Sequence, residues 1–106
     1  MKEDLIFSEN EGILTARITC DIDHHTAKPM RESIDQLLFE RKPSTLVIDF
    51  SEVGFMDSSG LGLILGRADK AASLGISVKV IGLSPTLMKL VRLCGIEKIK
   101  NLSVTR

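Results

Sequence analysis

Apolar and polar residues alternate along the chain from Leu14 to Cys20. A period of two with β-branched residues predicts a strand that buries one face. A short apolar run at residues 5–7 and a turn-forming segment at residues 9–12 come before it. The alternating strand is therefore expected to be the second arm of a β-hairpin.

The next segment has the spacing of a helix. Apolar residues recur three or four positions apart between residues 27 and 38, which predicts one buried helical face. Thr26 is expected to be the N-cap, with Pro29 in the first turn, where its missing N–H does little harm. The sequence Arg41-Lys42-Pro43 is expected to end this helix.

Two almost continuous apolar runs, at residues 46–50 and 76–81, predict buried strands, the first of them central in a sheet. A helix is predicted between them, and another from an N-cap at Ser84 to Gly95. Residues 96–104 are expected to form a short strand or an irregular tail. The order β-β-α-β-α-β-α-β is typical of an α/β fold with a mixed sheet, whose later strands are parallel and covered by helices.

Length and charge narrow the possible functions. A chain of 106 residues is expected to form a single domain over residues 1–106. It carries 14 Lys plus Arg and 14 Asp plus Glu, and this balance argues against binding to nucleic acid or to an anionic membrane. The sequence lacks a signal peptide and any apolar run of about eighteen residues, so a cytoplasmic protein is expected. Cys20 and Cys94 are expected to be reduced core thiols.

The segment from residue 54 to residue 67 enters a helix that is expected to run to about residue 75, with Asp57 or Ser58 as its N-cap. A helical wheel places one apolar arc against the sheet. This arc holds Leu61, Ile64, Leu65, Ala68, Ala71 and Ala72. The opposite side holds Ser58, Gly62, Gly66, Asp69, Lys70 and Ser73, with Leu63 and Arg67 at its margin.

Two glycines on the outer side of this helix are unusual, because each costs about 1 kcal/mol relative to alanine. A strip of bare backbone at Gly62 and Gly66, beside an exposed Leu63, would let another protein approach closely. These three residues are therefore candidate partner-binding residues. The alternative is that the glycines relieve crowding against loops of the same chain.

Ser58 and Ser59 begin the helix, where free backbone N–H groups favour a phosphate. Phosphorylation adds about −1.5 to −2 charges, which Asp57 repels and the helix end attracts, so we expect little change in the fold. Burying such a charge in an interface costs several kcal/mol, which is enough to prevent binding of a partner. The alternative is that Ser58 serves only as a helix cap.

Two segments resemble motifs of one protein family. Residues 55–62, Phe-Met-Asp-Ser-Ser-Gly-Leu-Gly, resemble the signature of STAS-domain anti-anti-sigma factors, and residues 21–27 resemble the second motif of that family at the right distance before it. The predicted order of strands and helices also agrees with this family. The similarity is greatest to the sporulation branch, which antagonises the anti-sigma-F factor.

The resemblance implies a function and a set of sites. The unphosphorylated protein would bind an anti-sigma factor, itself a serine kinase, and so release a sigma factor. Phosphorylation would fall on Ser58, with Ser59 as the other possible acceptor, and a PP2C-type phosphatase would reverse it. The resemblance also implies that Asp23 and Asp57 lie at the surface that the kinase recognises. Ser59 is counted with them as a candidate partner-binding residue. The resemblance leaves open whether the pathway is sporulation or stress.

The sequence gives little support for metal binding or for catalysis. The pair His24-His25 lacks a third ligand at metal spacing, so neither a metal nor another cofactor is expected. The sequence has no GxSxG motif, and an aspartate beside Ser58 is wrong for a base relay, so we do not expect an enzyme. Two alternatives to the switch remain: a module that senses a nucleotide or anion at the helix start, and a subunit of a larger sensory assembly.

Overall fold

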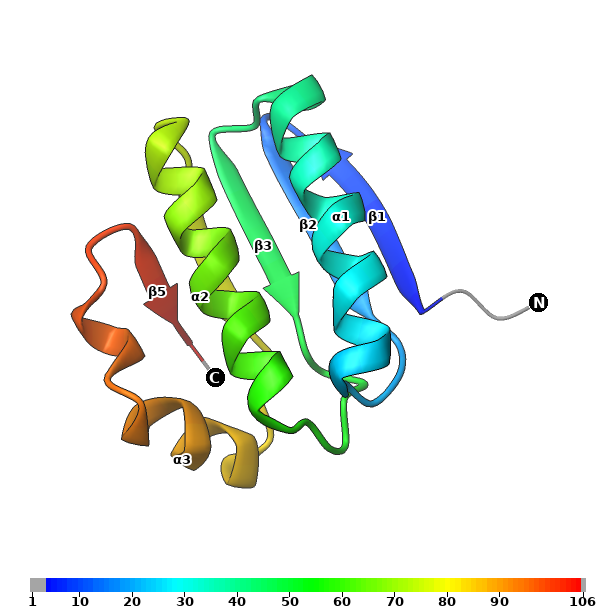
Figure 1. Cartoon of the computed structure of the whole chain (residues 1–106). Coiled ribbons are helices and arrows are strands. Elements are labelled where there is room, and N and C mark those ends of the chain that lie inside the picture. Colours follow the sequence, from blue (N-terminus) through cyan, green and yellow to red (C-terminus); the bar gives the residue numbers. More distant parts are fainter. Residues whose placement is uncertain (1–3, 106) are drawn as a thin grey trace.

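The computed structural model describes residues 4–105 (Figure 1). Strands and helices alternate in the predicted order after an initial hairpin, which confirms the expected α/β fold class. The elements are β1 (Leu5–Asn10), β2 (Ile13–Ile18), α1 (His24–Arg41), β3 (Thr45–Asp49), α2 (Ser58–Ser73), β4 (Ser77–Ile81), α3 (Pro85–Leu93), the 3-10 helix η1 (Ile96–Lys98) and β5 (Leu102–Val104).

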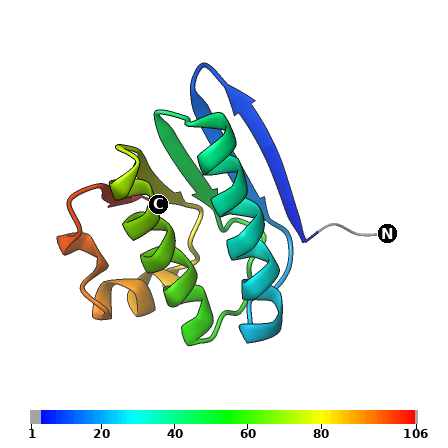
Figure 2. The same cartoon turned by 45° about the horizontal axis from the view of Figure 1, so that its top comes forward.

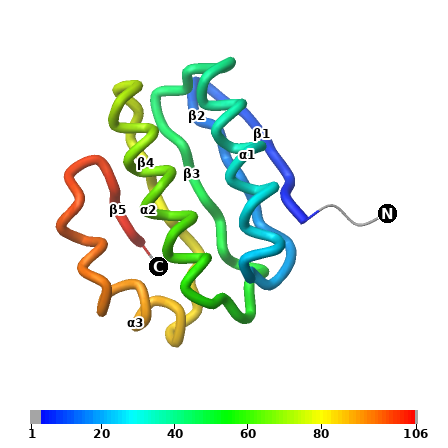
Figure 3. The backbone as a smooth tube through the Cα atoms, viewed as in Figure 1, coloured from blue at the N-terminus to red at the C-terminus, as the bar shows by residue number. Residues whose placement is uncertain are grey.

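Within the described residues the strands form one mixed sheet in the order β1-β2-β3-β4-β5, with β3 central as predicted (Figure 3). The β1–β2 hairpin is antiparallel and every later pair is parallel. The hairpin turn is tighter than the predicted four residues. It consists of Glu11 and Gly12, both with positive φ, which suits the twist of a two-residue turn.

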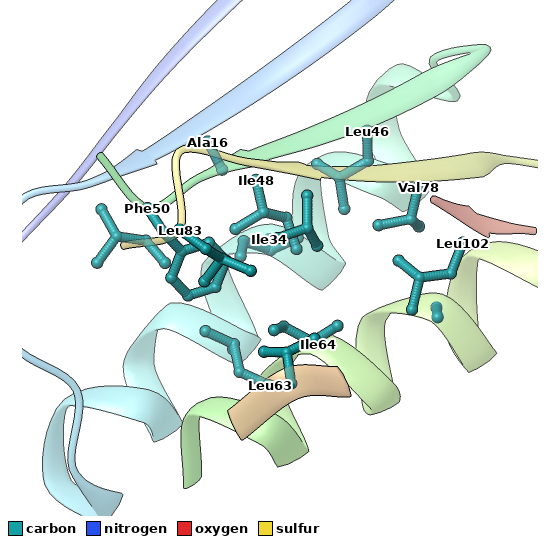
Figure 4. Close-up of a cluster of buried hydrophobic side chains, with 14 of the residues drawn as sticks. Ala16, Ile34, Leu46, Ile48, Phe50, Leu63, Ile64, Val78, Leu83 and Leu102 are labelled. Atoms are coloured by element: carbon teal, nitrogen blue, oxygen red, sulfur yellow. The ribbon is translucent and has the colours of Figure 1, made fainter. Parts of the chain in front are cut away.

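Helices α1 and α2 lie side by side across one face of the sheet, and α3 lies beside the start of α2 (Figures 1 and 2). The core fills the space between the sheet and these helices (Figure 4). The strands therefore bury alternate residues: in β3, Leu46 and Ile48 are fully buried, whereas Val47 and Asp49 are half-buried. The apolar run at residues 46–50 thus belongs to a central strand that is covered on one face only.

Helix α1 begins three residues earlier than the sequence predicted. Asp23, rather than Thr26, is the N-cap, and its carboxylate accepts hydrogen bonds from the backbone N–H groups of His25 and Thr26. The Thr26 hydroxyl accepts from the Asp23 N–H in return, which completes a capping box. Pro29 consequently lies in the second turn. A carboxylate accepts two such bonds at once, which explains why it takes the cap.

The C-terminal part follows the prediction with one exception. Ser84 caps α3 by accepting from the N–H of Leu87, and Pro85 is the first helical residue. The prediction that Cys94 is a core thiol was wrong, because α3 ends at Leu93 and Cys94 is its exposed C-cap. Cys20 is half-buried. Among residues 4–105, no helix is both long and apolar enough to cross a bilayer.

Candidate functional site

The two sequence motifs meet at one end of the sheet, where the β2–α1 and β3–α2 loops lie side by side (Figures 1 and 2). A parallel bridge joins Ile22 to Met56. The Ile22 N–H donates to the Phe55 carbonyl at 3.0 Å, and the Asp57 N–H donates to the Ile22 carbonyl at 3.1 Å. Segments more than thirty positions apart in the chain are therefore held in a fixed register.

Asp21 adds a second connection between these loops. Its Oδ1 accepts hydrogen bonds from the backbone N–H groups of Gly54 and Phe55, each at 3.1 Å. Sequence reasoning missed this role, since it took Asp21 only as part of the upstream motif and singled out Asp23. An acidic residue in the loop just after β2, within the upstream motif, was the available signal.

Asp23 has a structural task that the resemblance did not imply. The hydrogen bond from the backbone N–H of Thr26 is the largest cause of a pKa of the Asp23 carboxyl below its ordinary value. Desolvation opposes this effect, and the hydrogen bond from the His25 N–H adds to the lowering. Asp23 is nevertheless exposed, beside the start of α2. Its contact with a kinase partner stays a prediction.

Helix α2 begins at Ser58, and its N-cap is Asp57, whose carboxylate accepts from the Ser59 N–H at 2.7 Å. Ser58 is exposed and Ser59 is half-buried. Gly60 is buried, and a Cβ there would lie 2.5 Å from the sulfur of Met56, so this position requires glycine. Sequence reasoning did not identify Gly60, because residue types alone do not show that the turn before α2 brings Met56 against a residue four positions later.

The glycine strip of α2 is open. A Cβ at Gly62 or at Gly66 would meet no atom of the described residues within 4 Å. Crowding against loops of the same chain therefore does not explain these two glycines. Gly62 is exposed and Gly66 is half-buried, so backbone is accessible at the outer side of the helix as predicted.

The predicted positions of two leucines beside this strip were wrong. Leu63 was expected at the exposed margin, yet it is 3% exposed and points into the core (Figure 4). Leu65 was expected to face the sheet, yet it is 38% exposed. Helix α1 packs beside α2 and covers a flank that a sheet alone would leave open, so the buried arc of α2 is rotated toward α1.

The same rotation buries Arg67. Its side chain is 5% exposed and pairs with Asp35 of α1, with 2.7 Å between Nε and Oδ1 and a hydrogen bond of 3.2 Å from Nη2 to Oδ2. Burial lowers the pKa of the Arg67 guanidinium, and the neighbouring Asp35 carboxylate partly opposes that shift. The ion pair joins the two helices.

A hollow of about 230 Å³ lies between the N-terminal halves of α1 and α2. It is lined by His24, Ala27, Arg31, Ser59, Gly62 and Leu63.

The ring centroids of His24 and His25 are 4.1 Å apart. Within residues 4–105 no group of three or more His, Cys, Asp or Glu side chains is arranged to hold a metal ion.

Residues 5–106 match the STAS domain family. The chain is 31% identical over 99 residues to the anti-sigma F factor antagonist of Paenibacillus polymyxa, an alignment that covers 93% of this chain and 85% of the relative. It is 30% identical over 95 residues to the anti-sigma-B factor antagonist of Bacillus subtilis, covering 90% of this chain and 85% of the relative. These relatives are regulators of sigma-factor pathways.

The fold is shared with SpoIIAA of Bacillus, an anti-sigma factor antagonist whose structure is known in unphosphorylated and phosphorylated forms. Both comparisons have a TM-score of 0.74 and cover 96% of this chain, and they cover 88% and 91% of the respective SpoIIAA chains. At 23% and 24% identity they show a common fold. The match over residues 5–106 and the 31% identity to the Paenibacillus polymyxa protein establish that this chain belongs to the STAS domain family.

Proposed function

We propose that the protein is an anti-sigma factor antagonist of the cytoplasm that is switched at Ser58. The unphosphorylated form binds an anti-sigma factor that is also a serine kinase, and this binding releases a sigma factor. The kinase phosphorylates Ser58 and thereby ends the interaction, and a PP2C-type phosphatase restores it. The protein itself acts by binding and catalyses no reaction.

The main support for this proposal is that Ser58 begins α2 without serving as its N-cap. Asp57 supplies the N-cap, so the exposed hydroxyl of Ser58 is not used for capping. A serine that begins a helix without capping it has no local structural role that would compete with modification. The names of the two curated relatives, both antagonists of anti-sigma factors, support the same function.

The experiment that tests the switch is mass spectrometry of the intact protein and its peptides after incubation with ATP and each anti-sigma-type serine kinase of the host. We expect a single phosphate on Ser58, because Ser58 is exposed and Ser59 is half-buried. A phosphate on Ser59 instead would move the acceptor by one position. The absence of phosphate with every such kinase would overturn the proposal.

Replacing Gly62 separates partner binding from folding. In Gly62→Ala the added methyl group meets no atom within the described residues, so we expect the free energy of unfolding to rise by about 1 kcal/mol through better helix propensity. Affinity for the anti-sigma factor is expected to fall at least about tenfold, because the methyl group obstructs close backbone approach. Thermal unfolding and calorimetric titration measure the two effects.

Ala72→Ser is the control. The helical wheel placed Ala72 against the sheet, and this prediction was wrong, because Ala72 is exposed near the end of α2. Gly75→Ala is unsuitable as a control because Gly75 has positive φ. The affinity of Ala72→Ser should equal that of the wild type. An unchanged affinity of Gly62→Ala would contradict the role of the glycine strip in docking.

An anion or nucleotide sensor is less well supported by the same region. The hollow beside Ser59, at about 230 Å³, is smaller than the roughly 300–1,000 Å³ typical of small-molecule sites. Phe55, the aromatic residue nearest the helix start in sequence, lines a different hollow beside α3, so it is not available to stack on a base there. These facts favour the switch over a sensor.

A further inference from the structure

Phe55 is an exposed aromatic residue three positions before Ser58. Its side chain is 59% exposed and lines a hollow of about 340 Å³ between the β3–α2 loop and α3. Across this hollow lies Leu93, which is 80% exposed. Among the described residues that line this hollow, Lys89 is the one that carries a charge. The hollow is therefore apolar with one cation at its edge, and its wall at residues 54–56 belongs to the loop that leads into α2 at Ser58.

The backbone of Phe55 is held from both sides. Its N–H donates to Oδ1 of Asp21 at 3.1 Å, and its carbonyl accepts from the Ile22 N–H at 3.0 Å. Asp21 also accepts from Gly54, so the turn before Phe55 is fixed as well. A large ring on a backbone that is already ordered loses little conformational entropy on binding, which is the usual property of an interface anchor.

Phe39 is the natural comparison for this residue. It is 68% exposed, but it lies near the C-terminal end of α1, whereas the N-terminal end of α1 is beside the start of α2. With about 1.5 Å of rise per residue, Phe39 is roughly 22 Å along the helix from His24. The chain thus offers two exposed phenylalanines, one beside the switch and one remote from it.

We propose that Phe55 is an anchor that enters an apolar pocket of the same kinase partner that acts on Ser58, and that Asp21 is the positioning residue that holds it. The partner surface opposite this hollow is expected to be apolar with an acidic group that meets Lys89, since the hollow is apolar with a single cation at its edge. The inference rests on the proposed function and adds the surface through which the partner is recognised.

The decisive experiment is a double-mutant cycle with the full chain in its unphosphorylated form, titrated with the anti-sigma kinase that phosphorylates Ser58. Phe55→Ala is expected to weaken binding at least thirtyfold, as is usual for a buried aromatic anchor, and Phe39→Ala less than twofold. Asp21→Ala is expected to weaken binding about tenfold. In the Phe55→Ala background the same Asp21 change should matter less than twofold, because Asp21 acts through Phe55.

The contribution of the Lys89 charge is tested separately. Lys89→Glu should weaken binding at least tenfold, whereas Lys98→Glu, an exposed lysine of η1, should leave it within twofold. Thermal unfolding of each variant checks its folding, and Asp21→Asn, whose Oδ1 can still accept both hydrogen bonds, should restore the binding that Asp21→Ala loses.

Each outcome is decisive. Equal affinities of Phe55→Ala and Phe39→Ala would overturn the anchor, and independent, multiplicative effects of Asp21→Ala and Phe55→Ala would overturn the positioning role. A Lys89→Glu affinity equal to that of Lys98→Glu would overturn the acidic partner surface. These results are distinct from failure of the proposed function, in which the wild type itself would neither bind an anti-sigma kinase nor receive a phosphate.

Discussion

Ser58→Asp is expected to bind the anti-sigma factor at least about 100-fold more weakly than Ser58→Ala, which should bind as tightly as the unphosphorylated wild type. The reason is desolvation: a carboxylate at the first position of α2 must lose its water when the partner covers the loop, and this costs about 3 kcal/mol or more without a new cation to pair with. Calorimetric titration of both variants with the same kinase measures the difference.

The Ser58→Asp substitution should hardly change the stability of the fold. A negative charge at the start of α2 interacts favourably with the helix dipole, while Asp57 beside it repels, so the free energy of unfolding should change by less than about 1 kcal/mol. Ser33→Asp, on the exposed side of α1, is the matched control and should bind like the wild type. Equal affinities of the Ser58→Ala and Ser58→Asp variants would refute the switch.

Leu63→Ala is expected to reduce the free energy of unfolding by about 3 kcal/mol. Its side chain is 3% exposed and packs among core residues such as Ile64 and Ile34, so truncation removes buried apolar surface and leaves a cavity (Figure 4). For a domain of about this size, the melting temperature should fall by roughly 12–20 °C. Thermal or denaturant unfolding of the purified variant measures the loss.

Leu65→Ala is the matched control two positions away. Leu65 is 38% exposed, so the same chemical change should cost about 1 kcal/mol or less. If Leu65→Ala were the more damaging of the two, the buried arc of α2 would be the one that the helical wheel predicted rather than the one in the structure. The two variants therefore test directly how α2 is rotated against the sheet.

Local patterns were sufficient to predict most of the architecture. The alternation in β2, the apolar run of β3 and the Ser84-Pro85 start of α3 each depend on interactions within a few residues, and each prediction was confirmed. Asp57 was one of the two caps proposed for α2, because capping is also local. The start of α1 was missed, since Thr26 and Asp23 are both good caps and belong to the same capping box.

The candidate site was predicted in part. The position of Ser58 at a helix start and the open backbone at Gly62 follow from residue types along one helix, and both agree with the structure. The roles of Asp21 and Gly60 were not predicted. Asp21 acts through hydrogen bonds to a loop more than thirty positions away, and Gly60 is required because the turn before α2 places Met56 against it.

By itself, the sequence determined the order of the elements, the family motifs and the serine at the start of α2, because each of these is encoded within a short stretch of chain. Only the tertiary structure decided which side of α2 is buried. A helical wheel assumes a single covering surface, whereas α2 packs on the sheet and on α1 together. That second contact buries Leu63 and Arg67, exposes Leu65, and leaves the glycine strip beside Ser58 open.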